Sequence, residues 1–263
     1  MKPVANISAG HDSNAGDGLA LAANQPLASC KQFRKQVELS QRQICQRIWA
    51  DGGAGQRVKN EATAVANLER IIRATLKLAN KKGFAATSLR DLSAETGLSM
   101  GGLYAYIGGK DELAALIQHH GRALIHDVMQ QQMAAETTAV GRLRAGVRSH
   151  LFLSEVLQAW FFFCFMEARY LAKPQKAAAI ESEQQTETIF RELLEQGSSA
   201  GEFVVTDAGL SASMLKALLQ DWYLKRGKYR RRNISVERYA DHVLVLMLGH
   251  LADANGADIV ARS

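Results

Sequence analysis

Apolar residues recur at intervals of three and four along most of this 263-residue chain. That spacing places them on one face of a helix, whereas a half-buried strand needs strict alternation. Only 3 prolines are present, so few positions interrupt a helix. With 47% hydrophobic and 22% charged residues, the chain has the balance of a globular protein of one large or two small domains. These features predict an all-α fold.

The net charge of +6 lies entirely in the first half of the chain. Residues 1–125 contain 16 Lys and Arg against 10 Asp and Glu, whereas residues 126–263 contain 16 of each kind. A basic half joined to a neutral half favours a polyanion as the partner of the first half.

The remaining composition excludes several other classes. The chain has three cysteines, Cys30, Cys45 and Cys164. Their odd number and their lack of metal-type spacing indicate a reducing, cytoplasmic setting. No run of 18 apolar residues is present, so no membrane association is expected. No histidine pair has the spacing of a helical metal site in the group His119, His120 and His126. Without a phosphate loop or nucleophile motif, we expect no enzyme, no catalytic residues, no metal and no cofactor.

The first 56 residues form an N-terminal extension in this interpretation. Residues 1–30, rich in Ala, Gly, Asn and Ser, are predicted to be disordered, and residues 51–55 to be a flexible linker. Between them, an amphipathic helix is indicated by one apolar stripe: Phe33, Val37, Ile44 and Ile48. Either the stripe packs on the protein, or the segment is a basic arm that reaches DNA. A third possibility is that translation starts later.

Residues 57–112 carry the pattern of three short helices. A first helix from about Val65 ends at Gly83, after two lysines in its last turn. Ser88 can cap a second helix, and Ser99 can cap a third after a turn at Gly97. Two short helices joined by a glycine turn make a helix-turn-helix, whose second helix enters the DNA major groove. Five glycines and almost no charge between residues 96 and 113 suit such close approach.

The run GFAATSLRDLSAETGLSMGGLYAYIGGKDEL, residues 83–113, resembles the DNA-binding domain of the TetR/AcrR family of bacterial transcriptional regulators. The match covers roughly residues 67–117. The resemblance implies phosphate contacts from Ser88 and Lys110. It also implies a DNA-facing set on and after the third helix: Ser99, Met100, Gly101, Gly102, Tyr104 and Tyr106.

The DNA contacts implied by the resemblance have an alternative at two tyrosines, and several positions of the chain differ from the family pattern. Tyr104 and Tyr106 could instead pack in the three-helix core. Gly102 replaces a larger side chain of the family pattern, and Met100 offers a thymine methyl only an apolar contact, so DNA shape can carry part of the specificity. Ile107 replaces a customary phenylalanine, and Gly108-Gly109 replaces the usual polar cap.

Residues 113–263 are predicted to form further helices, which resemble the family's effector-binding and dimerisation domain in length and architecture. One predicted helix, residues 156–170, is apolar nearly all round. Its side chains can be plain core, or together can wall an effector pocket: Trp160, Phe161, Phe162, Phe163, Met166, Glu167 and Tyr170. The basic run 225–232 is predicted to be a solvated loop, with an anionic ligand as the alternative.

The resemblance implies a dimeric repressor that binds a pseudo-palindromic operator in double-stranded DNA and is released by a small apolar or amphipathic effector. Two other classes stay open on the residues alone. A nonspecific DNA-packaging protein needs the basic half but not the neutral one, and a small-molecule carrier needs only the second half. Binding to random and to palindromic DNA distinguishes the three.

Overall fold

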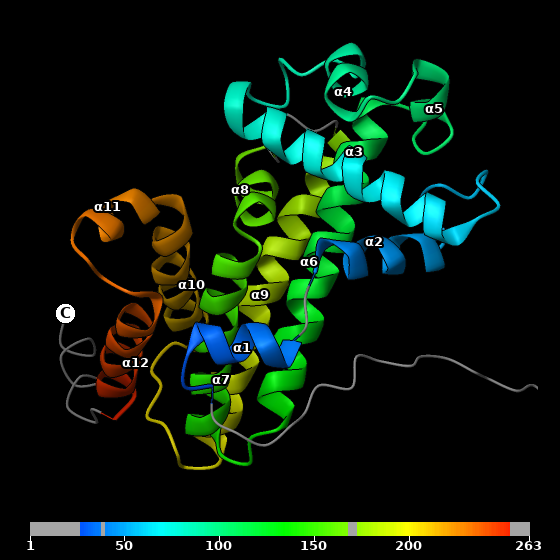
Figure 1. Cartoon of the computed structure of the whole chain (residues 1–263). Coiled ribbons are helices and arrows are strands. Elements are labelled where there is room, and N and C mark those ends of the chain that lie inside the picture. Colours follow the sequence, from blue (N-terminus) through cyan, green and yellow to red (C-terminus); the bar gives the residue numbers. More distant parts are fainter. Residues whose placement is uncertain (1–26, 38–39, 168–172, 253–263) are drawn as a thin grey trace, which may run out of the picture.

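The computed structural model describes residues 27–37, 40–167 and 173–252. The sequence predicts disorder for residues 1–30; residues 1–26 lie outside this part of the chain, whereas Leu27 is buried and Cys30 begins a helix. All regular structure in the described ranges is helical, which confirms the all-α prediction. Figure 1 shows one group of helices at one end of the molecule, above a bundle of further helices.

The upper group contains the three predicted helices, one long and two short, and each begins at the polar cap that its sequence supplies. They are α3 (Glu61–Lys82), α4 (Leu89–Thr96) and α5 (Met100–Tyr104). The side chains of Asn60, Ser88 and Ser99 each accept a hydrogen bond from the backbone N–H three residues on, which satisfies one otherwise unpaired donor. Leu92 and Leu103 are fully buried in this group, in which α4 packs on α3 and α5 packs on α4.

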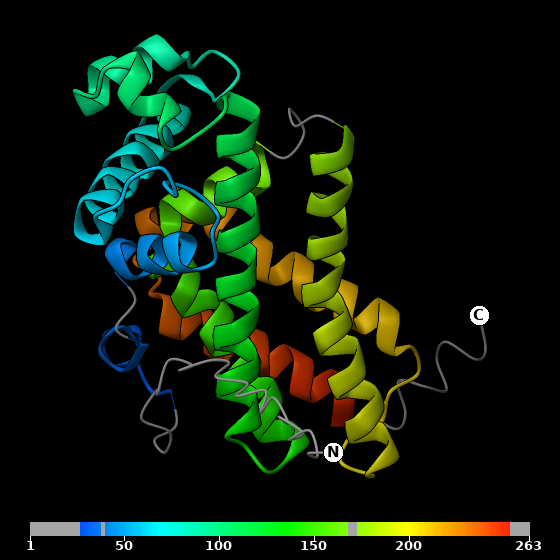
Figure 2. The ribbon, with the colours of Figure 1, turned by 90° about the vertical axis from the view of Figure 1, so that its right-hand side faces the viewer.

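The lower bundle is built around one central helix. Its elements are α6 (Lys110–Ala134), α7 (Ala139–Val156), α8 (Gln158–Met166), α9 (Lys173–Ser199), α10 (Ala208–Leu224), α11 (Arg226–Arg231) and α12 (Val236–Ala252). Helix α7 packs against α6, α9, α10 and α12, so most of its residues are buried. Figure 2 shows α6 and α9 running along the length of the molecule.

Three boundaries in the lower bundle differ from the sequence prediction. The chain bends by 97° between α7 and α8, so the apolar helix predicted from residue 156 begins only at Gln158. Helix α9 passes through Gly197, where a Cβ would lie 2.3 Å from the ring of Phe203, and the chain turns at Gly201 with φ of 74°. Close packing, not helix termination, therefore explains Gly197. Part of the predicted basic loop is the short helix α11.

The N-terminal extension packs on both parts of the molecule. Helix α1 (Cys30–Val37) lies on α7, where the rings of Phe33 and Phe152 are 5.7 Å apart, and the Cys30 N–H donates to Glu237 of α12 at 3.1 Å. Helix α2 (Gln41–Ala50) lies on α3 and also touches α6. The predicted stripe is fully or almost fully buried in both helices: Phe33, Val37, Ile44 and Ile48. The packed alternative therefore describes residues 30–37 and 40–50.

Residues 51–55 form a folded turn in place of the expected flexible linker. The Gly53 N–H donates to the Ile48 carbonyl at 2.9 Å, and Ala54 is buried. Gly52 and Gly55 adopt φ of 72° and 75°, a conformation that favours glycine. The glycines thus serve a specific turn geometry, not chain mobility.

Two further observations concern membranes and metals. No single helix in the described ranges is long and apolar enough to cross a bilayer; only the bent pair α7 and α8 meets the length and composition criteria together. Within the same ranges, no group of three His, Cys, Asp or Glu residues is placed to hold a metal ion.

Candidate DNA-binding interface and ligand region

The turn between α4 and α5 is fixed by hydrogen bonds. Gly97 adopts φ of 69°, in the left-handed region, and its N–H donates to the Ser93 carbonyl at 2.9 Å. The buried Thr96 hydroxyl donates to the Leu92 carbonyl at 2.6 Å and accepts from the Leu98 N–H at 3.2 Å. Arg70 of α3 donates to the Thr96 carbonyl. The angle between α4 and α5 is therefore set by the turn itself and by α3.

Helix α5 presents small residues and one large aromatic side chain to the outside. Ser99 and Gly101 are exposed, Met100 and Gly102 are half-buried, and Tyr104 is 45% exposed. Tyr104, the last residue of α5, is thus a large side chain available to an external partner. The structure brings these five predicted DNA-facing residues together on one short element.

Gly101 offers a sharp test of close approach. A Cβ built on this residue meets nothing within 4 Å, and its φ is not positive, so alanine fits without strain. We expect Gly101→Ala to stabilise the protein by about 1 kcal/mol through helix propensity. We also expect it to weaken DNA binding, because the added methyl group stands between α5 and the groove. Urea unfolding and a DNA-binding titration check the two halves; unchanged DNA affinity would show that α5 does not approach the bases at Gly101.

Tyr106 and Ser88, two other predicted contacts, have partners inside the protein. The Tyr106 ring is only 6% exposed, and its hydroxyl accepts a hydrogen bond from Asn67 Nδ2 at 2.8 Å. Tyr106 thus packs in the three-helix core, the alternative that the sequence left open. The Ser88 hydroxyl accepts from the Asp91 N–H at 3.1 Å and donates to the Asp91 carboxylate at 2.7 Å. The ion pair with Lys82 and the bonds from Ser88 hold the pKa of Asp91 well below its usual range.

Lys110, the predicted phosphate ligand at the start of α6, also contacts the protein. Its Nζ donates to the Ala85 carbonyl at 2.8 Å and lies 4.8 Å from the centre of the Phe84 ring. Partial burial lowers the pKa of Lys110, although Asp111 and Glu167 oppose that shift. Lys110 therefore ties the loop after α3 to α6. Arg90 on α4 is exposed and leaves a cation at the same end of the molecule.

Helix α8 connects this DNA-binding end to the lower bundle. The edge of the Phe84 ring packs on Phe163 at 5.3 Å between ring centres. From α6, the buried Gln118 side chain donates to the Cys164 carbonyl at 3.2 Å. A displacement of α8 would therefore act on both the loop after α3 and the helix that follows α5.

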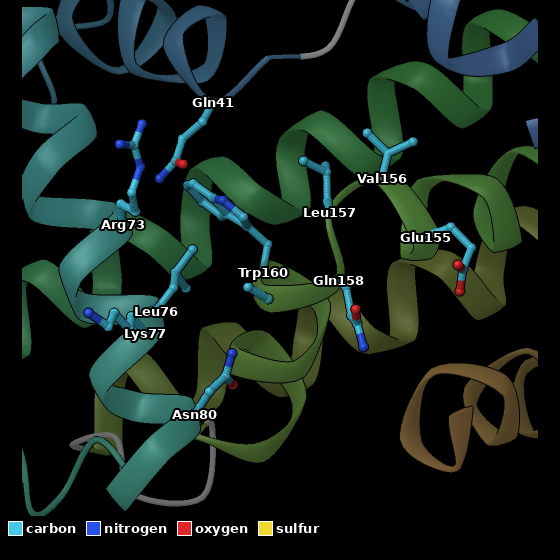
Figure 3. Close-up of a pocket in the computed structure, with 11 residues that line it drawn as sticks. Gln41, Arg73, Leu76, Lys77, Asn80, Glu155, Val156, Leu157, Gln158 and Trp160 are labelled. Carbon is cyan, nitrogen blue, oxygen red and sulfur yellow. The ribbon is translucent and has the colours of Figure 1, made fainter. Parts of the chain in front are cut away.

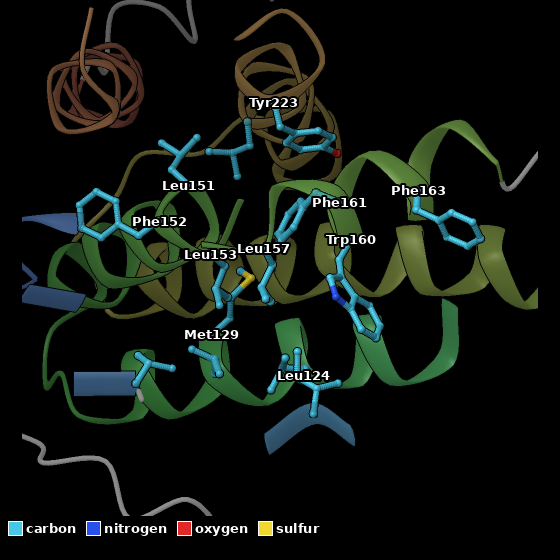
Figure 4. Close-up of a cluster of buried hydrophobic side chains, with 14 of the residues drawn as sticks. Leu124, Met129, Leu151, Phe152, Leu153, Leu157, Trp160, Phe161, Phe163 and Tyr223 are labelled. Carbon is cyan, nitrogen blue, oxygen red and sulfur yellow. The ribbon is translucent and has the colours of Figure 1, made fainter. Parts of the chain in front are cut away.

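The predicted effector residues of α8 divide into a buried and a less buried set. Trp160, Phe161 and Phe163 are at most 4% exposed. Figure 4 shows Trp160 and Phe161 among the other buried apolar side chains, whereas Phe163 lies at the edge of the cluster. Phe162 and Met166 are half-buried. Tyr170 lies outside the described residues. A cleft of about 450 Å³ opens between α3 and the α7–α8 junction (Figure 3). Of the predicted effector residues that the structure describes, Trp160 lines this cleft.

Two polar groups beside this cluster lack a hydrogen-bond partner. Glu167 is 5% exposed and its Oε2 is unpaired, as is Nδ1 of His150, which is 1% exposed. The His150 ring lies 5.5 Å from Phe161 and 6.2 Å from Tyr223, and burial holds the pKa of His150 well below its ordinary value. The sequence analysis missed His150, whose only signal was a histidine among apolar residues on the predicted helix.

Helices α10 and α12 expose large apolar side chains that the sequence analysis also missed. Tyr239 donates to the Leu218 carbonyl and Ser211 bonds to His250, which sets the two helices antiparallel. In that register Met214 lies level with Leu246. The exposed side chains are between 52% and 67% accessible: Leu210, Met214, Val245 and Leu246. Exposed apolar side chains such as these make α10 and α12 a candidate interaction surface.

Comparisons with known proteins agree with this architecture. Residues 71–117 match the family described as bacterial regulatory proteins of the tetR family, and residues 136–247 match the tetracyclin repressor-like C-terminal domain. A search of curated proteins gave no match. The two family matches together cover more than half of the chain.

Solved structures show the same fold. A tetR-family regulatory protein from Rhodococcus RHA1 is 22% identical, with a TM-score of 0.63 over 70% of this chain and 96% of that one. AibR in complex with isovaleryl coenzyme A and operator DNA is 20% identical, with a TM-score of 0.59 over 68% and 97%. The regulator FadR from Bacillus subtilis in complex with stearoyl-CoA is 18% identical, with a TM-score of 0.57 over 69% and 98%. With its helix-turn-helix and its C-terminal bundle both matched, the chain belongs to the TetR family of bacterial transcriptional regulators.

Proposed function

We propose that this regulator is a cytoplasmic repressor that binds a pseudo-palindromic operator as a homodimer and leaves it when a small apolar or amphipathic effector binds. The observation that carries the proposal is the exposed Tyr104 on α5, a helix capped by Ser99 and held by a rigid turn. A rigid element with few acidic groups can enter a groove between two phosphate backbones.

The dimer in this proposal uses the apolar face of α10 and α12. Burying Met214 and Leu246 against the same face of a second copy removes apolar surface from water, and a two-fold interface uses one patch twice. The dimer then presents two α5 helices, which must match half-sites about one or more helical turns apart.

The effector in this proposal acts through α8. A ligand beside α8 can shift the Phe84–Phe163 contact and, with it, α6 and the spacing of the two α5 helices. The ligand must bind the DNA-incompetent arrangement more tightly, because equal affinity for both arrangements shifts nothing. Acyl coenzyme A thioesters, found in complex with AibR and with FadR from Bacillus subtilis, are the first effectors to test.

Replacing Tyr104 tests the operator interface. We expect Tyr104→Ala to weaken binding to the operator by about 1–3 kcal/mol, the usual cost of a lost base contact, while the fold stays intact. Fluorescence anisotropy with an operator found by selection from random DNA measures the loss.

Replacing Arg90 tests a phosphate contact. Arg90→Gln should weaken binding to all DNA and reduce the dependence of log affinity on log salt concentration by about one phosphate contact.

Glu192→Ala is the control, because Glu192 is exposed on α9 and belongs neither to the helix-turn-helix nor to the proposed dimer face of α10 and α12. Wild-type affinity in the Tyr104→Ala protein would contradict the proposed interface. Equal affinity of the parent protein for palindromic and random DNA would favour a packaging protein, and no DNA binding at all would favour a carrier.

A further inference from the structure

The cleft between α3 and the α7–α8 junction is a candidate ligand site distinct from the buried aromatic cluster. Its volume of about 450 Å³ lies within the usual range for small-molecule sites. One wall comes from α3 in the DNA-binding end and the other from Glu155 to Trp160 in the lower bundle, while Gln41 of α2 closes one side. Figure 3 shows Leu76 and Asn80 facing Trp160 and Gln158 across it.

Hydrogen-bond donors and cations dominate the polar part of this lining. Arg73 and Lys77 lie one turn apart on α3, and both line the cleft. Each has one carboxylate partner, Glu69 and Glu95 respectively, and neither partner belongs to the lining. The side chains of Arg73 and Lys77 are both 63% exposed. Such partly solvated pairs contribute little stability and can take another anion at low cost.

One further donor in the lining lacks an acceptor. The Nε2 atom of Gln41 is buried and has no hydrogen-bond partner. In the first turn of α8, the N–H groups of Trp160 and Phe161 already donate to the Leu157 carbonyl, at 2.9 Å and 3.0 Å, so this turn is not counted among the free donors.

The acidic residue at the cleft does not offset these donors. Glu155 accepts hydrogen bonds from Trp222 Nε1 at 2.9 Å and from Arg226, and both donors lie outside the cleft. The negative charge of Glu155 is therefore paired with donors of the lower bundle and not with the cations of the cleft. The apolar remainder of the lining includes Leu76, Leu157 and the Trp160 ring.

We propose that this cleft binds an amphipathic anion, with a carboxylate or phosphate group on Arg73 and Lys77 and an apolar part against Leu76 and Trp160. A ligand held there bridges α3 to α8, so it biases the position of the DNA-binding end relative to the lower bundle. That regulatory consequence rests on the proposed function; the binding itself does not.

Calorimetric titration of the full chain with octyl phosphate, octanoate, inorganic phosphate and 1-octanol tests the ligand class. We expect one of the two amphipathic anions to bind at least about 10-fold more tightly than either inorganic phosphate or 1-octanol, since each of these lacks one half of the recognised chemistry. The tighter of octyl phosphate and octanoate identifies the head group. Equal binding of 1-octanol, or no binding of either amphipathic anion, would overturn the proposal.

Paired substitutions test the location. Arg73→Gln with Lys77→Gln is expected to weaken the preferred anion at least about 10-fold, because charge-assisted hydrogen bonds are lost. Lys31→Gln with Lys35→Gln is the matched control: it removes the same charge at the same spacing from exposed positions of α1, and should leave the affinity unchanged. Equal affinities of the two double variants would sink the cleft as the site.

A cleft-filling variant guards against loss of folding in the charge variants. Ala159→Trp keeps both cations but fills space in the lining, so it should also abolish binding while circular dichroism and the melting temperature stay near those of the parent. Operator binding, measured in parallel, separates the two proposals. Anion binding without operator preference contradicts the proposed function alone, and operator binding without anion binding contradicts the cleft alone.

Discussion

A Met214→Glu, Leu246→Glu double variant is expected to be monomeric and to bind operator DNA at least about 100-fold more weakly than the parent protein. Both side chains are more than half exposed, at 60% and 52%, so neither substitution disturbs the core of the monomer. Four carboxylates would meet across a two-fold interface, where like charges repel and cannot be hydrated. Loss of the dimer removes the gain of holding two linked half-site contacts at once.

Sedimentation velocity and an operator titration measure the two effects. Met214→Gln with Leu246→Gln removes the same apolar area without charge and should give an intermediate dissociation constant. A double Glu variant that stays dimeric would place the dimer interface elsewhere on the molecule. A monomer with unchanged operator affinity would contradict the dimeric mode of binding.

Phe33→Ala is expected to lower the free energy of unfolding by about 3–5 kcal/mol, the usual cost of truncating a buried phenylalanine. Phe33 is fully buried on α1 and packs against Phe152 of the central helix α7. A loss of this size is a large fraction of the 5–15 kcal/mol that stabilises an ordinary domain. Urea unfolding followed by circular dichroism gives the value.

Arg34→Ala is the control, since Arg34 neighbours Phe33 in sequence but is exposed. It should change the unfolding free energy by less than about 0.5 kcal/mol. If Phe33→Ala changed the unfolding free energy as little as Arg34→Ala, α1 would not stabilise the fold. That result would favour the alternative in which the segment is a basic arm that reaches DNA.

Local signals predicted the DNA-binding end well. The caps Ser88 and Ser99 and the turn at Gly97 are short-range features, and each determines its own backbone geometry. Tyr104 and Tyr106 could not be told apart in the same way. Their exposures of 45% and 6% depend on α3, which supplies the Asn67 partner of Tyr106 from 39 residues away.

Features that depend on tertiary packing escaped the sequence. Gly197 suggests a helix end in the sequence, but the helix continues through it. Glycine is needed there because the Phe203 ring leaves no room for a Cβ atom. The exposed apolar residues of α10 and α12 resemble core residues in a helical pattern, because periodicity cannot distinguish a core from an interface. In the sequence, Arg73 and Lys77 resemble residues of the solvent-exposed face of α3. Only the tertiary structure shows that the start of α8 lies opposite them across the cleft.

The bond from the Cys30 N–H to Glu237 spans 207 residues, so the start of the described chain docks near its end. During synthesis α1 cannot complete this docking until α12 has left the ribosome. The contacts within the helix-turn-helix are closer in sequence, so we expect it to fold before α1 docks on α7 and α12. We therefore expect Phe33 and Val37 to stay exposed in the nascent chain for longer than the core of the helix-turn-helix.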